Sequence, residues 1–296
     1  MSAFCIAGPT ATGKSEIAAQ VARLIGAEIV NADAFQIYDG LDLLTAKPSE
    51  AMRAMVPHHL LGSVPLTEEM NAEKFRVAAL GAIREIQAGG KIALVVGGSG
   101  LYLKALTHGL ASLPKADRLL REKLTGATNE ELIAQLSELD PVGAGEIDRK
   151  NKRRLVRAVE VCLLTGRPFS AQRTGWNGAE TIAGIFLFRE RAELYERINR
   201  RVEQMFASGV VEEVRRTGEV RSTAEKTLGL REILALIAGE MTEPECVAKI
   251  QQATRRYAKR QLTWFQRQVS FWPVNLSRHD SSAAIELIVQ RAKVFA

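Results

Sequence analysis

The chain is poor in cysteine and has no long hydrophobic run. Its three cysteines, Cys5, Cys162 and Cys246, lie far apart without C-x-x-C spacing, so the sequence predicts neither a disulfide framework nor a cysteine zinc site. The first residues include no basic segment, and no run approaches the roughly 18 apolar residues of a membrane span. We therefore expect neither secretion nor membrane insertion, and the unpaired cysteines fit a reducing cytoplasm.

Aromatic residues are also scarce, at 6%, but a content of 46% apolar residues is sufficient for a buried core. A chain of 296 residues is near the upper limit for one core, so we expect a large domain with a smaller lobe. Forty Lys and Arg against 34 Asp and Glu give a net charge of +6. This excess permits a polyanionic partner without requiring one.

Four short apolar runs are continuous rather than alternating, and they lie at residues 3–7, 28–30, 92–96 and 184–188. Such runs are typical of a parallel sheet covered by helices on both faces. From residue 114 to about residue 177 the pattern indicates charged helices, and a last helix begins near Pro244. The sequence thus predicts an α/β fold, with a P-loop NTPase-like parallel sheet core at residues 1–113 and 181–296 and a helical insertion domain at residues 114–180.

The most specific motif lies between the first apolar run and a segment with helical periodicity. It has the pattern Gly-x-x-x-x-Gly-Lys-Ser and consists of Gly8, Pro9, Thr10, Ala11, Thr12, Gly13, Lys14 and Ser15. Between a strand and a helix, the backbone N–H groups of such a loop converge on one phosphate. Lys14 adds a charge for phosphoryl oxygens, and the Ser15 hydroxyl suits Mg²⁺. The alternative is a plain glycine-rich turn.

A carboxylate near this loop is the next candidate. A nucleoside triphosphatase usually has a metal-binding Asp after a buried strand, but the run at residues 92–96 is followed by glycines and Ser99. The first carboxylate that follows a predicted strand is instead Asp33, at the edge of the sheet where ligands bind. Its spacing fits a functional group facing the loop and, equally, a cap of the next turn.

Five segments together resemble one family, the tRNA dimethylallyltransferases or tRNA isopentenyltransferases. These are GPTATGKS at 8–15, NADAFQIY at 31–38 with TAKP at 45–48, VPHHL at 56–60, GGSGLYLKAL at 97–106 and TRRYAKRQLTWF at 254–265. Their order and spacing match, and the resemblance extends to about residue 272. It implies transfer of a dimethylallyl group from dimethylallyl diphosphate to N6 of the adenosine 3′ to the anticodon. It also implies release of diphosphate, a requirement for Mg²⁺ and a monomeric enzyme.

The resemblance assigns roles to individual residues. The general base of the family corresponds to Asp33, and Ser99 stands where the family more often has Thr, so the hydroxyl is kept. Arg201 corresponds to the arginine that reaches the diphosphate, a task that suits a planar group with several donors. A tight turn at Ser99 and a solvated helix face at Arg201 remain the alternatives.

Binding of tRNA is implied for several further positions. The most basic segment, residues 149–157, has six Lys or Arg in nine residues, and we expect its arginines to project toward phosphates while Leu155 and Val156 pack inward. A surface salt bridge is the alternative for Arg121, and Leu230 replaces a Tyr that is usual in the family. The tRNA-binding positions correspond here to Asp33, Ala34, Phe35, Gln36, Ser99, Arg121, Arg153, Arg154, Leu155, Val156, Arg157, Lys226, Thr227, Leu228, Gly229, Leu230 and Arg231.

Three other functions compete with this one. An adenylate prenyltransferase would share the loop and the base but would not need the basic segment. A P-loop small-molecule kinase would need the acid that is missing after residue 96, and a non-catalytic RNA-binding module would not need Lys14 and Asp33. We expect Tyr257, Trp264 and Phe265 to pack in the core, and we expect no zinc at His58 and His59.

Overall fold

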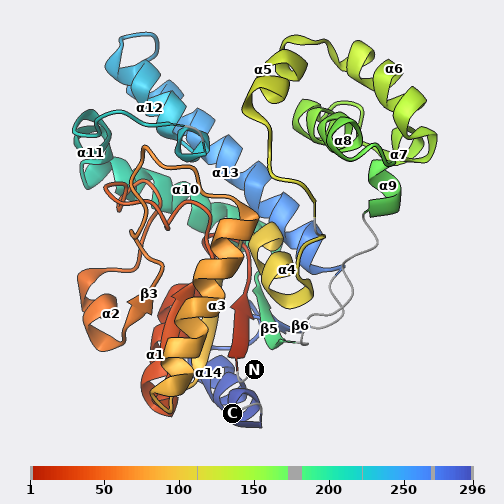
Figure 1. Ribbon diagram of the computed structural model, residues 1–296. Coiled ribbons are helices and arrows are strands. Elements are labelled where there is room, and N and C mark those ends of the chain that lie inside the picture. Colours follow the sequence, from red (N-terminus) through yellow and green to blue (C-terminus); the bar gives the residue numbers. More distant parts are fainter. Residues whose placement is uncertain (1–2, 112, 173–181, 222, 268–270, 295–296) are drawn as a thin grey trace. The chain divides into compact units, whose positions relative to one another are not determined.

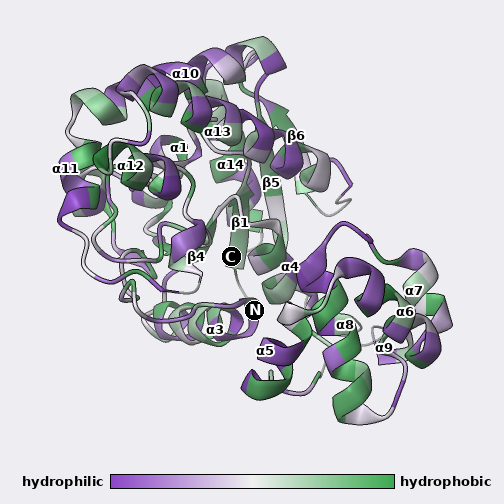
Figure 2. Ribbon diagram, turned by 90° about the horizontal axis from the view of Figure 1, so that it is seen from above, coloured by the Kyte–Doolittle hydropathy of each residue, from purple (hydrophilic) through white to green (hydrophobic). Residues whose placement is uncertain are grey.

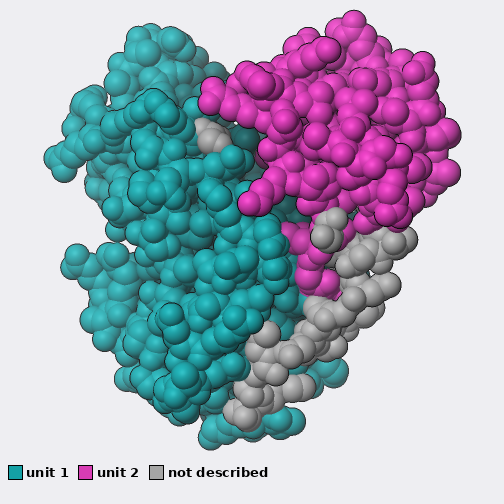
Figure 3. All heavy atoms as spheres, in the orientation of Figure 1, with its two compact units in different colours: residues 1–107, 180–296 teal, residues 108–179 magenta. Residues whose placement is uncertain are grey.

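The structure is a computed structural model that describes residues 3–111, 113–172, 182–221, 223–267 and 271–294. The chain forms two compact units: the first contains residues 1–107 and 180–296, and the second contains residues 108–179 (Figure 3). The boundary that the sequence predicts at residues 180–181 lies outside the described residues.

One parallel sheet forms the centre of the first unit. Its strands are β1 (Ala3–Ala7), β2 (Glu28–Asn31), β3 (His58–His59), β4 (Ala93–Gly97), β5 (Ala183–Phe188) and β6 (Phe271–Asn275). Their order is β3-β2-β4-β1-β5-β6, and Phe4 of β1 pairs with Leu94 of β4 and Ala183 of β5. Every residue of β1 and β4 is buried, which explains their continuous apolar runs. The predicted α/β fold is confirmed.

Helices cover both faces of this sheet (Figure 1). The helices of the first unit are α1 (Lys14–Ile25), α2 (Glu50–Met55), α3 (Ala72–Ala88), α4 (Gly100–His108), α10 (Arg191–Ala207), α11 (Val210–Arg215), the 3₁₀ turn η2 (Ala224–Lys226), α12 (Leu230–Ile237), α13 (Glu243–Phe265) and α14 (Ser281–Val294). Cys5 belongs to the apolar cluster of α3 and α13, whereas the next residue, Ile6, belongs to that of α1 and α14. This alternation follows from the two-residue repeat of a strand.

A further apolar cluster joins α10, α11, α12 and α13 to the loop that follows β2. It includes Leu44 from that loop, Val202 of α10 and Ile250 of α13. The helices alternate purple and green segments along their length, as expected for one exposed and one buried side (Figure 2). This cluster forms an apolar wall beside the loop that follows β2.

The second unit is helical in its described residues. Its helices are α5 (Arg118–Gly126), α6 (Asn129–Leu139), α7 (Pro141–Glu146), α8 (Lys152–Thr165) and α9 (Phe169–Gln172). Leu132 and Leu136 of α6 and Leu155 of α8 are fully buried in its core. The buried Asp140 begins α7, where it accepts from Gly143 N and from Ser170.

The sequence did not predict the last two elements of the chain. The predicted helix near Pro244 is α13, with Thr242 and Glu245 forming a capping box, but β6 and α14 follow it. In β6 Pro273 interrupts the apolar pattern, and proline is tolerated there because β6 is an edge strand. Within the described residues no helix has the length and hydropathy to cross a membrane.

Candidate active site

The phosphate loop connects β1 to α1 in the way its motif predicts. Gly13 has a φ of 93°, in the left-handed region that favours glycine, and it begins α1. The loop is tied to β4 because Gly8 N–H donates to Gly97 O at 3.2 Å, and it is closed internally because Thr12 Oγ1 donates to Pro9 O at 2.9 Å. The first N–H groups of α1 have no acceptor within the helix and can bind an anion.

Lys14 is buried beside this loop, with only 9% of its surface exposed. Burial lowers the pKa of Lys14, while the negative charge of Asp33 opposes that change. A bound anion would favour the charged lysine in the same way as Asp33 does, because both offset the cost of burying a cation. The site thus has a cation that gains from an anionic ligand.

Asp33 and Ser99 together shape the turn after β2. Asp33 Oδ1 accepts from Phe35 N at 3.0 Å and from Gln36 N at 3.4 Å, and Ser99 Oγ accepts from Ala34 N at 2.8 Å. Asp33 therefore caps the turn, which was one of the two alternatives that its spacing in the sequence allowed. This capping does not remove Asp33 from the site, since its carboxylate also lines a pocket.

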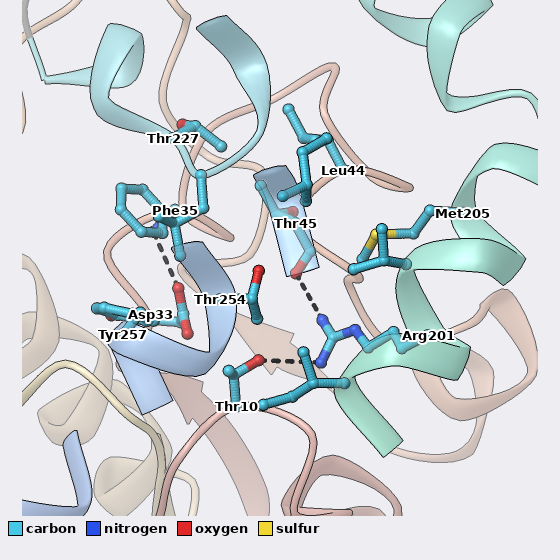
Figure 4. Close-up of a pocket in the computed structure, with 14 residues that line it drawn as sticks. Thr10, Asp33, Phe35, Leu44, Thr45, Arg201, Met205, Thr227, Thr254 and Tyr257 are labelled. Atoms are coloured by element: carbon cyan, nitrogen blue, oxygen red, sulfur yellow. Dashed lines mark hydrogen bonds between the residues drawn. The ribbon is translucent and has the colours of Figure 1, made fainter. Parts of the chain in front are cut away.

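This pocket lies between the phosphate loop, the turn after β2, α10 and α13 (Figure 4). Its polar part includes Thr10, Asp33 and Arg201, and its other lining residues are Phe35, Leu44, Thr45, Ile198, Val202, Met205, Thr227, Leu228, Ile250, Thr254 and Tyr257. Asp33 and Arg201 lie on opposite sides, with Thr10 at the base (Figure 4). One pocket thus joins a carboxylate, a guanidinium and an apolar wall.

Arg201 is fixed in this pocket rather than exposed on a helix face. Its guanidinium donates to Thr10 Oγ1 at 3.0 Å and to Thr45 O at 3.3 Å. Burial lowers the pKa of Arg201, whereas the charges of Asp33 and Glu16 raise it. An arginine held by two neutral oxygens retains its full positive charge for a ligand.

The sequence missed several residues that support the site. Gln261 of α13 is buried; its Oε1 accepts from Thr10 N at 3.0 Å and its Nε2 donates to Gly98 O at 2.8 Å. Tyr257, expected in the core, lines the pocket; burial raises its pKa, the charge of Asp33 adds to this, and hydrogen bonds to Ser99 and Gln261 oppose it. Both residues belong to the segment at 254–265, so the motif was the available signal. Phe265 is buried, as expected.

The sequence is similar to those of several known proteins. A family model described as IPP transferase matches residues 36–268. A tRNA dimethylallyltransferase of Akkermansia muciniphila is 41% identical over 280 residues, which are 95% of both chains. The chain belongs to the IPP transferase family. A second relative, tRNA dimethylallyltransferase 1 of Citrifermentans bemidjiense, is 45% identical and the match covers 88% of this chain and 87% of the relative.

Solved structures extend the comparison to three dimensions. A crystal structure of a eukaryotic dimethylallyltransferase acting on tRNA matches with a TM-score of 0.83 and 25% identity, over 97% of this chain and 78% of the other. This IPP transferase therefore has the P-loop-like fold of the family. The kinase and the non-catalytic RNA-binding module are not favoured by these relatives.

The segment at residues 226–231 divides between the pocket and the surface of this family member. Thr227 and Leu228 line the pocket, whereas Lys226 and Arg231 are exposed. Thr227 Oγ1 is buried and has no hydrogen-bond partner among the described residues. Leu230 packs in the apolar cluster around α12, and Gly229 begins that helix with a φ of 90°.

In the second unit the predicted tRNA-binding residues differ in what they contact. Arg121 and Arg157 form ion pairs with the fully buried Glu160, at 3.0 and 2.6 Å, so the salt-bridge alternative for Arg121 is realised in the structure. Leu155 and Val156 are buried in the core of this unit, as the helical pattern predicts. The exposed arginines of α8 are Arg153 and Arg154.

A second pocket lies behind the phosphate loop. It is lined by Lys14, Ser15, Ala18, Ile29, Asn31, Gln36, Pro48, His58, Leu61 and Val96. Ser15, Asn31 and Gln36 bring neutral oxygen-bearing groups to it. The neighbouring His59 binds Glu28 through Nε2 at 2.6 Å, and His58 Nδ1 lies 2.8 Å from Val56 O. Within the described ranges, no cluster of three or more His, Cys, Asp or Glu side chains is arranged to bind a metal.

Proposed function

We propose that this chain transfers the dimethylallyl group of dimethylallyl diphosphate to N6 of the adenosine 3′ to the anticodon of tRNA. One observation carries the proposal: Thr10 of the phosphate loop lines an apolar-walled pocket, and Asp33 and Arg201 lie on opposite sides of that pocket (Figure 4). The loop suits a diphosphate, the wall suits a five-carbon chain, and the carboxylate suits an amine. The names of the relatives support the same reaction.

The diphosphate end of the donor binds at the loop. Backbone N–H groups of the loop, Lys14 and Arg201 surround the position of this group, and the charge on the leaving oxygen grows as the allylic C–O bond breaks. Because these donors are already fixed by the loop and by Thr10, they stabilise that charge without rearranging. The loop thus stabilises a leaving group and hydrolyses nothing.

The acceptor end of the reaction is assigned to Asp33. The new bond joins N6 to the allylic carbon, the carbon–oxygen bond to diphosphate breaks, and one N6 proton passes to the Asp33 carboxylate. The backbone N–H groups of Phe35 and Gln36 hold Asp33 Oδ1, so the orientation of the carboxylate is set before substrate arrives. Ser99 holds the same turn through Ala34 N and positions the base.

Magnesium fits the oxygen groups beside the loop. Ser15 is the protein ligand that the motif provides, and Asn31 in the second pocket offers a neutral oxygen nearby. A site with few protein ligands suits Mg²⁺ that is bound mainly by diphosphate oxygens and water. When bound, the ion supplies positive charge to the departing diphosphate.

The tRNA contacts are assigned to exposed basic side chains and to the rim of the pocket. Arg153 and Arg154 of α8, together with Lys226 and Arg231, are exposed and suit the phosphates of an anticodon stem-loop. A stacked adenosine cannot present its N6 to a pocket, so the base must be turned out of the loop. Thr227 Oγ1 offers a hydrogen bond at the pocket. We assign the protein to the cytoplasm as a monomer.

A competition experiment tests this function. Labelled dimethylallyl diphosphate is supplied together with an anticodon stem-loop, with AMP, or with small hydroxyl acceptors and ATP. We expect the label in the stem-loop alone. Label in AMP would indicate an adenylate prenyltransferase, and ATP-dependent phosphorylation of an acceptor would indicate a kinase; either result overturns the proposal.

A further inference from the structure

Two arginines hold the phosphate loop from the side of α10. Arg197 Nε donates to Ala11 O at 2.9 Å, and Arg189 Nε donates to Thr12 O at 2.9 Å. These carbonyls belong to consecutive residues of the loop, and the arginines come from the far half of the chain, Arg197 on α10 and Arg189 just before it. Two guanidinium groups are thus bonded to the loop backbone itself, whereas Arg201 contacts the loop through the side chain of Thr10.

Each of these hydrogen bonds affects the N–H group that shares a peptide group with the bonded carbonyl. The Ala11 carbonyl shares a peptide group with the Thr12 N–H, and the Thr12 carbonyl shares one with the Gly13 N–H. A cation bonded to a carbonyl oxygen withdraws electron density and makes the N–H of that peptide a stronger donor. The Thr10 N–H already donates to Gln261 Oε1 at 3.0 Å, so it is engaged within the protein. The N–H groups that the arginines make stronger donors are those of Thr12 and Gly13, later in the loop.

The two arginines differ in how their charge is balanced. Arg189 donates to Glu193 Oε1 at 2.5 Å and to Leu276 O at 2.9 Å, so a carboxylate offsets its charge. Across the described residues, no carboxylate forms an ion pair with the half-buried Arg197. Its Nη2 lies 3.6 Å from the position that a Cβ on Gly13 would occupy, next to the anion-binding turn. Glu16 Oε2 lies 3.9 Å from the same position, and the charge of Arg197 also acts on Glu193. Arg197 therefore places beside the loop a positive charge that neighbouring carboxylates balance only at longer range, whereas Arg189 has a direct ion pair.

We propose that Arg197, assisted by Arg189, is a positioning residue that polarises the phosphate loop for the diphosphate of the donor. The inference rests on the proposed function for the identity of the ligand. It concerns binding of diphosphate by the loop, which can be measured without tRNA and without transfer. Arg197 acts through the peptide group that joins Ala11 to Thr12, so its loss should weaken the donor site and leave the tRNA site intact.

The test is calorimetric titration of the whole protein with inorganic diphosphate and Mg²⁺, together with steady-state kinetics. Arg197→Met should raise the diphosphate Kd and the KM for dimethylallyl diphosphate by about tenfold, because a charge-assisted bond is lost. Arg197→Lys keeps the charge and one donor, so it should raise the diphosphate Kd by about threefold. The charge of Arg189 is offset by Glu193, so the Kd of Arg189→Met should lie between those of Arg197→Lys and wild type. The KM for the stem-loop should stay within about twofold of wild type.

Arg200→Ala is the matched control, because Arg200 is an exposed arginine of the same helix that pairs with Glu196. Diphosphate binding by Arg197→Met that equals wild type or Arg200→Ala would overturn the proposal. So would an equal loss of donor and stem-loop affinity that lysine does not restore, since that pattern indicates a general structural role. Failure of the wild type to prenylate RNA, with normal diphosphate binding, would overturn the proposed function and leave this inference standing.

Discussion

At the scale of single residues, Asp33 has two roles that share one carboxylate. Its Oδ1 accepts the N–H groups that form the turn after β2, and the same side chain faces Thr10 and Arg201 in the pocket. A capping aspartate is therefore also the proposed base. Because both roles use the same group, a substitution that removes the whole side chain would alter the turn and the base together, and the two effects on activity could not be separated.

Asp33→Asn separates these roles. The amide oxygen can still accept from Phe35 N and Gln36 N, but the side chain can no longer take the N6 proton. We expect the rate of transfer to fall by about 10³-fold, in the range of general base catalysis, while stem-loop affinity stays within a few fold. Single-turnover transfer and filter binding measure the two quantities. Asp39→Asn, at an exposed position in the same loop, is the control, and a rate for Asp33→Asn near that of wild type would refute the assignment.

At the scale of elements, a polar cluster joins the open edge of the sheet to its centre. Glu28 at the start of β2 binds His59 of β3 and Lys91, which precedes β4, at 2.6 and 2.7 Å. The hydrogen bond from Lys91 and then that from His59 lower the pKa of Glu28. The short strand β3 is thus attached by side chains as well as by its two paired residues.

Glu28→Gln gives a pH-dependent prediction. A carboxyl group whose folded pKa is lowered stabilises the protein above its unfolded pKa, about 4.3, and loses this contribution as the pH falls through the folded pKa. The variant should be less stable than wild type by about 1 kcal/mol at pH 7, and the difference should close in acid. Urea unfolding at pH 7 and near pH 3 measures it. A deficit that stays constant across this range would contradict the electrostatic account.

The elements that the sequence predicted well are those with local signals. The phosphate loop has its Gly-x-x-x-x-Gly-Lys-Ser motif, β1, β4 and α3 have continuous or periodic apolar patterns, and α13 has a proline and a capping box at its start. β6 and α14 were missed because Pro273 interrupts the strand pattern and nothing local indicates which strand it joins. The pairing of β6 with β5 depends on contacts across the fold.

The candidate site shows the same division between local and distant signals. Asp33 and the loop were predicted because each follows a strand, but Gln261 and Arg197, which hold the loop, were not. Gln261 meets Thr10 across 251 positions in the chain, and Arg197 meets Ala11 across 186. No periodicity encodes such contacts.

At the scale of the whole molecule, the positive charge is divided between two uses. In the second unit, Arg121 and Arg157 form ion pairs with the buried Glu160, so they compensate its charge in that unit's core. Arg153 and Arg154 remain exposed and available to a polyanion. The dense basic segment at residues 149–157 is therefore only partly an RNA-binding surface in the proposed function.

The double variant Arg153→Ala with Arg154→Ala tests this division. Loss of two phosphate contacts should weaken stem-loop binding and reduce the slope of log K against log salt by about 1.5 to 2. Fluorescence anisotropy between low and moderate salt measures the slope. Arg118→Ala, at an exposed ion pair of the same unit, should leave it unchanged. An unaltered slope in the double variant would remove α8 from the interface.

In the proposed function, cleavage of the diphosphate ester and alkylation of the adenine occur together in one pocket. Nucleoside digestion of a stem-loop after reaction, with mass spectrometry of the adenosines and assay of released diphosphate, tests it most directly. We predict one diphosphate released for each N6-dimethylallyl adenosine formed, all at the adenosine 3′ to the anticodon. Diphosphate released without modified adenosine, or a modified base at another position, would contradict the account.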